Sequence, residues 1–334
     1  MFQIPKRIPL AVSALITLLV AIWGGLLRLQ WQLPIPQASW MTFHGPLMIS
    51  GFFGTIIGLA RANVLKSTVG LLVPLTTVLG AWILILGGPA TWAAILFLAA
   101  SLGYLVLSLG FFKKQPAYAA ALALIGGCGW AWSNYFWWQG HPIPHVIAGW
   151  QLLFVLTISS ERLEDASWTA ARMKGVMLAI IVGALVTGAI VQPFHPAVGV
   201  RVFSAGYLLL GISLFAWDRH WRNPGPTDWG KYTQYCLIAG YTWLLAGGVI
   251  GATQAPVDSG FAYDAFLHSI FLGLIFSMVF SHAPRLLPRV LKAPVPFHWF
   301  FYSHWALLQI SLCARVAGDL FQSTPWRRWG ALLN

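Results

Sequence analysis

The chain has 334 residues, of which 58% are hydrophobic and only 8% are charged, and its mean hydropathy is +0.72. A water-soluble domain carries about 25% charged residues, so a soluble fold of this length would leave large apolar patches in water. The formal net charge is +12, but the basic residues are scattered singly between apolar runs. They form no sustained basic stripe, which argues against nucleic acid as a partner and for the lipid bilayer.

Long unbroken apolar runs predict membrane-spanning α-helices, because a barrel would need short strands of alternating polarity. Eleven spans are predicted, at residues 8–30, 43–61, 67–88, 90–112, 117–138, 144–161, 174–194, 197–217, 231–253, 262–283 and 297–318. The final residues, 326–334, are typical of the approach to a twelfth span. Because all the connecting loops are short, we expect an all-α polytopic bundle in which residues 1–334 form a single transmembrane domain.

The positions of Lys and Arg predict the orientation, since cytoplasmic loops are enriched in both. With the N-terminus inside, 15 of the 20 basic residues fall on cytoplasmic segments. The remaining five are Arg28, Arg201, Arg315, Arg327 and Arg328. We therefore expect a multi-pass protein of the inner, cytoplasmic membrane with its N-terminus in the cytoplasm.

Small residues and cysteines inside the spans also carry information. Gly51, Gly54 and Gly58, together with the glycines of residues 126–129, predict close approach of neighbouring helices. The three cysteines lie in apolar runs and form no C-x-x-C-H motif, which argues against covalently attached haem.

Nine histidines stand against only eight acidic residues, and polar groups at membrane depth are costly enough to suggest a function. In the predicted topology five histidines share the outer half of the membrane: His44, His141, His145, His195 and His268. Imidazole is the commonest ligand of haem iron and copper, and helical bundles build such sites from inward-facing side chains. The alternative is that each is an interfacial residue that faces water.

The second span begins with an H-x-x-x-M-x-x-G-F pattern, held by His44, Met48, Gly51 and Phe52. This segment resembles helix 2 of subunit I of the haem–copper oxidases. It is still more similar to NnrS-type proteins, which are membrane proteins with haem and copper associated with nitric oxide metabolism. The resemblance implies haem b with His44 as an axial ligand and His268, in the tenth span, as the opposing ligand.

The sequence departs from the oxygen-reducing oxidases at several positions. The tenth span has a lone His268 where those enzymes have H-x-H, and His141 is followed four residues later by His145 in place of a tyrosine. A full oxygen-reducing centre is therefore not expected. His145 with His141 or His195 is a candidate copper site. His304, which approaches from the inner half, is a candidate ligand of a second cofactor or a partner of a haem propionate.

Charged residues offer further candidates. Arg315 and Asp319 are spaced i, i+4 in the last span, which predicts either an ion pair or an Arg315 that holds a haem propionate or a quinone oxygen. Asp264 precedes His268 by one helical turn and is positioned to orient its imidazole. The charges at the end of the sixth span, Glu161, Arg162, Glu164 and Asp165, predict a solvated anchor or a proton entry point.

These observations predict a membrane haem protein, with copper as a second metal, that acts on nitric oxide or a related diatomic gas or transfers electrons. A redox protein or a quinol would be its electron donor. Two alternatives remain open at this point: a cofactor-free transporter whose histidines relay protons, and a structural subunit of a larger membrane complex.

Overall fold

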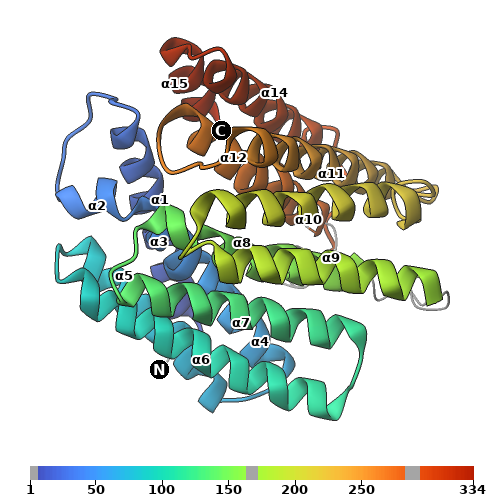
Figure 1. Cartoon of the computed structure of the whole chain (residues 1–334), viewed down its shortest axis with the longest axis horizontal. Helices are drawn as coiled ribbons and strands as arrows, with labels where there is room; N and C mark the ends of the chain where they lie inside the picture. The colour runs from blue at the N-terminus through green and yellow to red at the C-terminus, as the bar shows by residue number, and fades with distance from the viewer. Residues whose placement is uncertain (1–6, 163–171, 283–293) are drawn as a thin grey trace. The chain divides into compact units, whose positions relative to one another are not determined.

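The computed structural model describes residues 7–162, 172–282 and 294–334, and every regular element within these ranges is helical (Figure 1). The all-α prediction is therefore confirmed. Two members of the charged group that ends the sixth span, Glu164 and Asp165, lie outside the described residues. The same holds for four of the basic residues used to predict orientation, Lys6, Arg285, Arg289 and Lys292.

Helices occupy all eleven predicted spans. Among the described residues, eight helices are long and apolar enough to cross a membrane: Ile8–Arg28, His44–Val64, Ala90–Lys114, Ile143–Ser160, Met173–Val191, Pro196–Trp217, Asp228–Gln254 and Gly260–His282. The helix at Val69–Ile85 is apolar but shorter. A multi-pass chain of this kind is a membrane protein, because only lipid leaves so many apolar helices without a penalty.

The chain divides into two compact units, residues 1–160 and 161–334. The expectation of a single domain stays a prediction, and the two units are described separately below.

Unit 1 contains the elements α1 (Ile8–Arg28), α2 (Ala38–Thr42), α3 (His44–Pro46), η1 (Leu47–Phe53), α4 (Gly54–Val64), η2 (Val69–Leu71), α5 (Leu72–Ile85), α6 (Ala90–Lys114), α7 (Tyr118–Trp138) and α8 (Ile143–Arg162). The η1 segment is a π-helix, and it continues from α3 into α4. It packs against both α1 and α5, and α5, α6 and α7 follow one another as packed neighbours.

Glycines set the close contacts of unit 1. A Cβ atom at Gly51 would lie 2.9 Å from the side chain of Thr17, and one at Gly54 would lie 2.9 Å from the ring of Trp130. A Cβ atom at Gly129 would lie 2.9 Å from the backbone oxygen of Gly149, so α7 and α8 touch backbone to backbone. The prediction that these glycines permit close helix approach is confirmed.

Unit 2 contains α9 (Arg172–Val191), α10 (Pro196–Trp217), α11 (Asp228–Gln254), α12 (Gly260–His268), the π-helix η3 (Ser269–Phe276), α14 (Phe301–Leu320) and α15 (Thr324–Leu333). Helix α10 packs against α9 and α11, and α14 packs against α12, η3 and α15. Helix α15 covers the predicted approach to a twelfth span, but its ten residues are about half of what a span needs.

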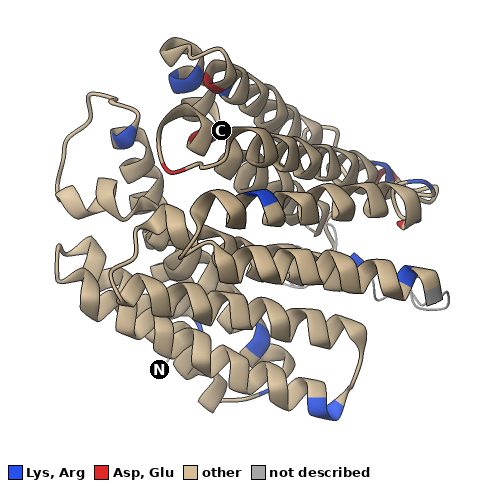
Figure 2. Ribbon diagram, viewed as in Figure 1, with Lys and Arg blue, Asp and Glu red and all other residues tan. Residues whose placement is uncertain are grey.

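The outer surfaces of the helices are apolar. Large side chains such as Leu19, Val106 and Ile310 are more than half exposed, and Lys, Arg, Asp and Glu occupy few positions along the helices (Figure 2). Most residues of the apolar span in α8 are buried (72%), whereas only 28% are buried in α6 and in α9. The exposed apolar faces are compatible with contact with lipid tails. Polar residues that are buried lie between the helices, in the interior of each unit.

Candidate functional site

His44 is the first residue of α3, and its half-buried ring lies against α1. Its Nδ1 atom is 2.6 Å from the backbone oxygen of Ala21. A carbonyl oxygen only accepts hydrogen bonds, so Nδ1 carries the proton and donates it. In the neutral ring the lone pair is then on Nε2, and a lone pair is what a ring nitrogen needs to act as a metal ligand.

A pair of glycines in α1 makes room for this arrangement. A Cβ atom at Gly25 would lie 2.9 Å from Cε1 of His44 and 3.1 Å from its Nδ1. A Cβ atom at Gly24 would overlap the backbone oxygen of Trp40 in α2. Because both neighbours are close, α1 accepts the α2–α3 turn only with glycine at these two positions.

Met48, the second element of the sequence pattern, lies one turn after His44 and is half-buried. It is part of η1, where the backbone is π-helical. Single π-helical stretches inside α-helices are rare and frequently occur at functional sites. The pattern that predicted a haem ligand therefore coincides with an unusual backbone.

The other two histidines of unit 1, His141 and His145, lie just before the start of α8 and within its first turn. The ring of His141 packs edge-on against Phe136, with 4.9 Å between ring centroids, and His145 is half-buried in the first turn. A Cβ atom at Gly45 would meet the side chain of Ile143 at 3.9 Å. The beginnings of α3 and α8, and with them His44 and His145, are therefore at the same end of unit 1.

His268 is the last residue of α12 and is half-buried. Its Nδ1 atom is 2.8 Å from the backbone oxygen of Asp264 and 3.3 Å from the carboxylate oxygen Oδ1 of the same residue. Here too Nδ1 donates, and Nε2 holds the lone pair of the neutral ring. The π-helix η3 begins at the next residue, as η1 begins three residues after His44.

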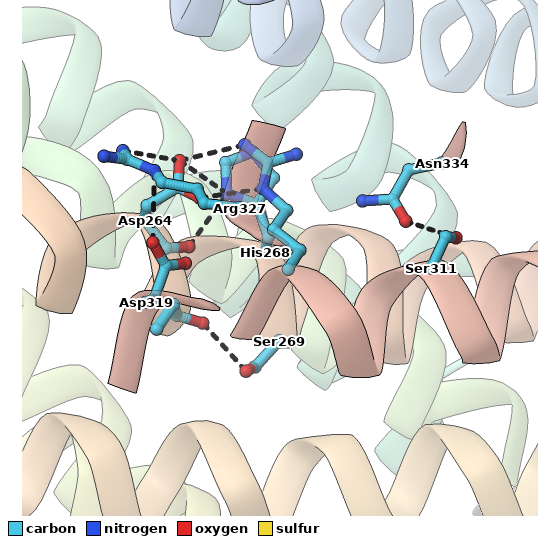
Figure 3. A network of polar contacts seen from close by, with 9 residues as sticks. Asp264, His268, Ser269, Ser311, Asp319, Arg327 and Asn334 are labelled. Atoms are coloured by element: carbon cyan, nitrogen blue, oxygen red, sulfur yellow. Dashed lines mark hydrogen bonds and ion pairs between the residues drawn. The ribbon is translucent and has the colours of Figure 1, made fainter. Parts of the chain in front are cut away.

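The Asp264 carboxylate is the centre of a buried ionic cluster (Figure 3). Arg315 donates to it from Nε at 2.7 Å and from Nη2 at 2.9 Å, a bidentate arrangement. Arg327 adds a third cationic contact, with Nη2 at 3.4 Å from Oδ1. Asp264 and Arg315 are 8% and 7% exposed, so both charges depend on their protein partners.

Asp319 completes the cluster from α14. Its carboxylate is buried, and Oδ1 lies 3.1 Å from Nε of Arg327, close enough for an ion pair but not aligned as a hydrogen bond. A Cβ atom at Gly318 would lie 2.4 Å from the backbone nitrogen of Arg327, so glycine lets α15 approach α14. Two carboxyl groups and two guanidinium groups thus lie together beside the imidazole of His268.

The remaining predicted residues lie elsewhere in unit 2. His195 is exposed and precedes the first residue of α10. His304 is on α14, where its Nε2 atom is 3.1 Å from the hydroxyl of Tyr232 and its ring packs edge-on against Phe280. In the described parts of the chain, no group of three or more His, Cys, Asp or Glu side chains is placed to hold a metal ion.

Arg315 pairs with Asp264, and Asp319 pairs with Arg327, so the predicted i, i+4 ion pair of Arg315 with Asp319 is wrong. The contact of Asp264 with His268 was predicted, but its contact with Arg315 was not.

Three contributors were missed from the sequence: Arg327, Gly25 and the carbonyl of Ala21. One signal for Arg327 was present, because two acidic residues in predicted spans, Asp264 and Asp319, require cations of about equal number. The adjacent glycines of the first span, Gly24 and Gly25, indicated a close contact with another segment, but they did not indicate which segment that would be.

A family model described as "Domain of unknown function (DUF8744)" matches residues 7–334. The chain belongs to the DUF8744 family. Searches of curated proteins and of solved structures give no match. The match covers both units of this DUF8744 protein, so the histidine-bearing helices of both belong to the family's shared region.

Proposed function

We propose that this DUF8744 protein is a membrane haem b protein in which His44 and His268 are axial ligands of haem iron. One observation carries the proposal. In each unit a half-buried histidine donates from Nδ1 to a backbone carbonyl, which gives Nε2 the lone pair that iron requires.

The donor chemistry of the chain fits haem. Imidazole nitrogens are the usual axial ligands, and a hydrogen bond from Nδ1 to a carbonyl fixes both the tautomer and the direction of the ring. Apolar surroundings suit the macrocycle, and both histidines belong to helices that are apolar enough to span the bilayer. Haem, when bound, supplies one-electron redox chemistry, and an iron held by only one of the two histidines would also have a coordination position for a diatomic gas.

The other residues hold the ligands in place. Asp264 accepts from His268 through its backbone and keeps its carboxylate beside the same nitrogen. Arg315 and Arg327 hold that carboxylate, so the imidazole is supported by a second and a third layer of contacts. In this role Arg315 orients Asp264 through one N–H group on Nε and one on Nη2. Contact of Arg315 with a propionate or a quinone oxygen would use the other N–H groups of its guanidinium.

The proposal includes an orientation and a place in the cell. Most Lys and Arg residues lie on segments that are cytoplasmic if the N-terminus is inside, which favours the inner membrane and puts His44 and His268 toward the outer face. Nitric oxide or a related gas, or electrons from a redox protein or a quinol, would then be handled on that side. Copper at His145, with His141 or His195, is an added part of the proposal.

A cofactor-free transporter is the second candidate, because the cluster of Asp264, Asp319, Arg315 and Arg327 also has the composition of a proton-relay site. A purified protein without haem but with proton-coupled flux in liposomes would favour this candidate.

Haem content tests the first proposal directly. We expect the purified chain to contain non-covalent haem b, measured as the pyridine haemochrome, and we expect His44→Ala and His268→Ala each to lower the haem-to-protein ratio at least about threefold. His298→Ala, at an exposed histidine, is the matched control and should keep the wild-type ratio. A wild-type protein without haem, after expression with adequate haem supply, would contradict the proposal.

The same series shows how many irons are involved. If the two histidines share one iron, each single variant changes the spectrum of all the haem that remains. If they serve separate irons, each variant removes one part of the spectrum and leaves the other unchanged.

A further inference from the structure

Unit 2 contains a cavity of about 290 Å³ that is distinct from the surroundings of His268. It lies where α11 begins. The residues that line it are Arg162, His220, Asn223, Pro224, Trp229, Gly230, Thr233, Ser281 and His282. Several of these side chains are polar, and one, Arg162, is cationic.

Arg162 is the last residue of α8 but lies within the bounds of unit 2, and it is the decisive residue of this cavity. It is only 4% exposed, and its Nε atom is buried with no hydrogen-bond partner among the residues that the structure describes. A buried guanidinium with an unused N–H group is costly, because the protein must replace the water that it has lost. An acceptor with negative charge in the cavity would remove that cost.

The N-terminus of a long helix adds to the positive potential. Trp229 and Gly230, in the first turn of the 27-residue helix α11, line the cavity. The first turn of a helix has backbone N–H groups without partners in the helix and a partial positive charge, which together favour anions. Thr227 caps this helix by accepting from the backbone nitrogen of Gly230.

Two histidines on the cavity wall are both fixed through Nδ1. That of His220 is 2.9 Å from Oδ1 of Asp218, and that of His282 is 2.6 Å from the backbone oxygen of Met278. The Asp218 carboxylate also accepts from the hydroxyl of Tyr241. Its charge is therefore engaged by His220 and Tyr241, so that it opposes an anion beside Arg162 less than an unbonded carboxylate would.

We infer that this cavity binds a phosphate oxyanion. Arg162 supplies the charge and an unused N–H group, and the start of α11 supplies its positive end. The hydroxyls of Thr233 and Ser281 donate to the backbone oxygens of Ser281 and Met278, so they are not counted as donors to the anion. Free inorganic phosphate and the phosphate of an anionic lipid headgroup share this chemistry. A cavity of 290 Å³ accommodates either one.

Binding to the full chain tests the inference in two arms. In the first, inorganic phosphate is titrated into delipidated protein in dodecyl maltoside and binding heat is measured. In the second arm, the protein is reconstituted in nanodiscs of phosphatidylglycerol and phosphatidylcholine. The protein is then released from the nanodiscs, and native mass spectrometry identifies the lipid that stays bound to it. Arg162→Gln is the test variant, and Arg219→Gln, at an exposed residue near the cavity, is the matched loss of charge.

We expect Arg162→Gln to weaken binding about tenfold or more, because charge-assisted hydrogen bonds are the strong ones, and Arg219→Gln to stay within about twofold of wild type. Such a loss in the phosphate arm identifies a free anion as the ligand. A loss confined to retained phosphatidylglycerol identifies a lipid headgroup. Equal behaviour of the two variants in both arms overturns the inference.

Arg162→Lys keeps the test decisive if Arg162→Gln does not fold. This variant keeps the positive charge but removes the Nε donor and the planar guanidinium. About threefold weaker binding than wild type supports the site, and unchanged binding overturns it.

Discussion

His44 in unit 1 and His268 in unit 2 are both half-buried and fixed through Nδ1, but they use different neighbours. His44 donates to Ala21, a residue of another helix 23 positions earlier, and depends on glycine at position 25 for space. His268 donates to the carbonyl of Asp264 in its own helix, one turn earlier, and adjoins an ionic cluster. One histidine is held by backbone packing and the other by electrostatics.

The position of each histidine in its helix explains the difference. His44 begins α3, so the carbonyl four residues earlier belongs to the separate helix α2, where it lies against Gly24. His268 ends a full α-helical run, so an i−4 carbonyl is available to it. A histidine at the start of a helix therefore donates to a carbonyl of a neighbouring helix, whereas a histidine at the end of a helix donates to a carbonyl of its own helix.

The largest expected effect is in unit 2. Asp264→Asn leaves the buried Arg315 and Arg327 without their shared carboxylate, which should lower the free energy of unfolding by about 3–5 kcal/mol. The measurement is denaturant or thermal unfolding in detergent. Asp228→Asn removes an exposed carboxylate from the same unit and should leave unfolding unchanged. Equal effects of the two variants would show that the cluster does not stabilise unit 2.

A smaller effect with a definite sign is expected in unit 1. Gly25→Ala places a methyl group against the His44 ring and should destabilise the protein by about 1–2 kcal/mol despite the better helix propensity of alanine. The matched variant is Gly110→Ala on α6, where a Cβ atom meets nothing within 4 Å. It should stabilise the protein by up to about 1 kcal/mol. The same sign for both variants would rule out the proposed role of Gly25.

An effect of about the same size tests the geometry of the ionic cluster in unit 2. Arg315→Lys keeps the charge but loses the two parallel hydrogen bonds to Asp264, and we expect a loss of about 1–2 kcal/mol in unfolding free energy. The measurement is the same unfolding curve. If the lysine variant is as stable as wild type, charge alone suffices and the bidentate geometry has no energetic role.

The helices of this protein were predictable from the sequence, because long apolar runs reflect the thickness of the bilayer. Close contacts at Gly51, Gly54 and Gly129 were predictable for a similar reason, since small residues permit them. The contact of His268 with Asp264 was also predictable, because one helical turn separates the two residues.

Contacts between elements that are distant in the sequence were not predictable. Helical periodicity does not reveal that Ala21 accepts from His44, or that Arg327 of α15 reaches Asp264. The π-helical backbone of η1 and η3 was not predictable either, because its composition is that of any apolar helix. These features depend on which helices pack together, which a single sequence does not state.

The central claim is that His44 and His268 present Nε2 to haem iron, and a reduced-minus-oxidised optical spectrum tests it most directly. The account predicts the α and Soret bands of haem b in the wild type and in His298→Ala. It predicts that these bands are shifted or lost in His44→Ala and in His268→Ala. A colourless wild-type protein, or wild-type bands in both of the latter variants, would contradict it.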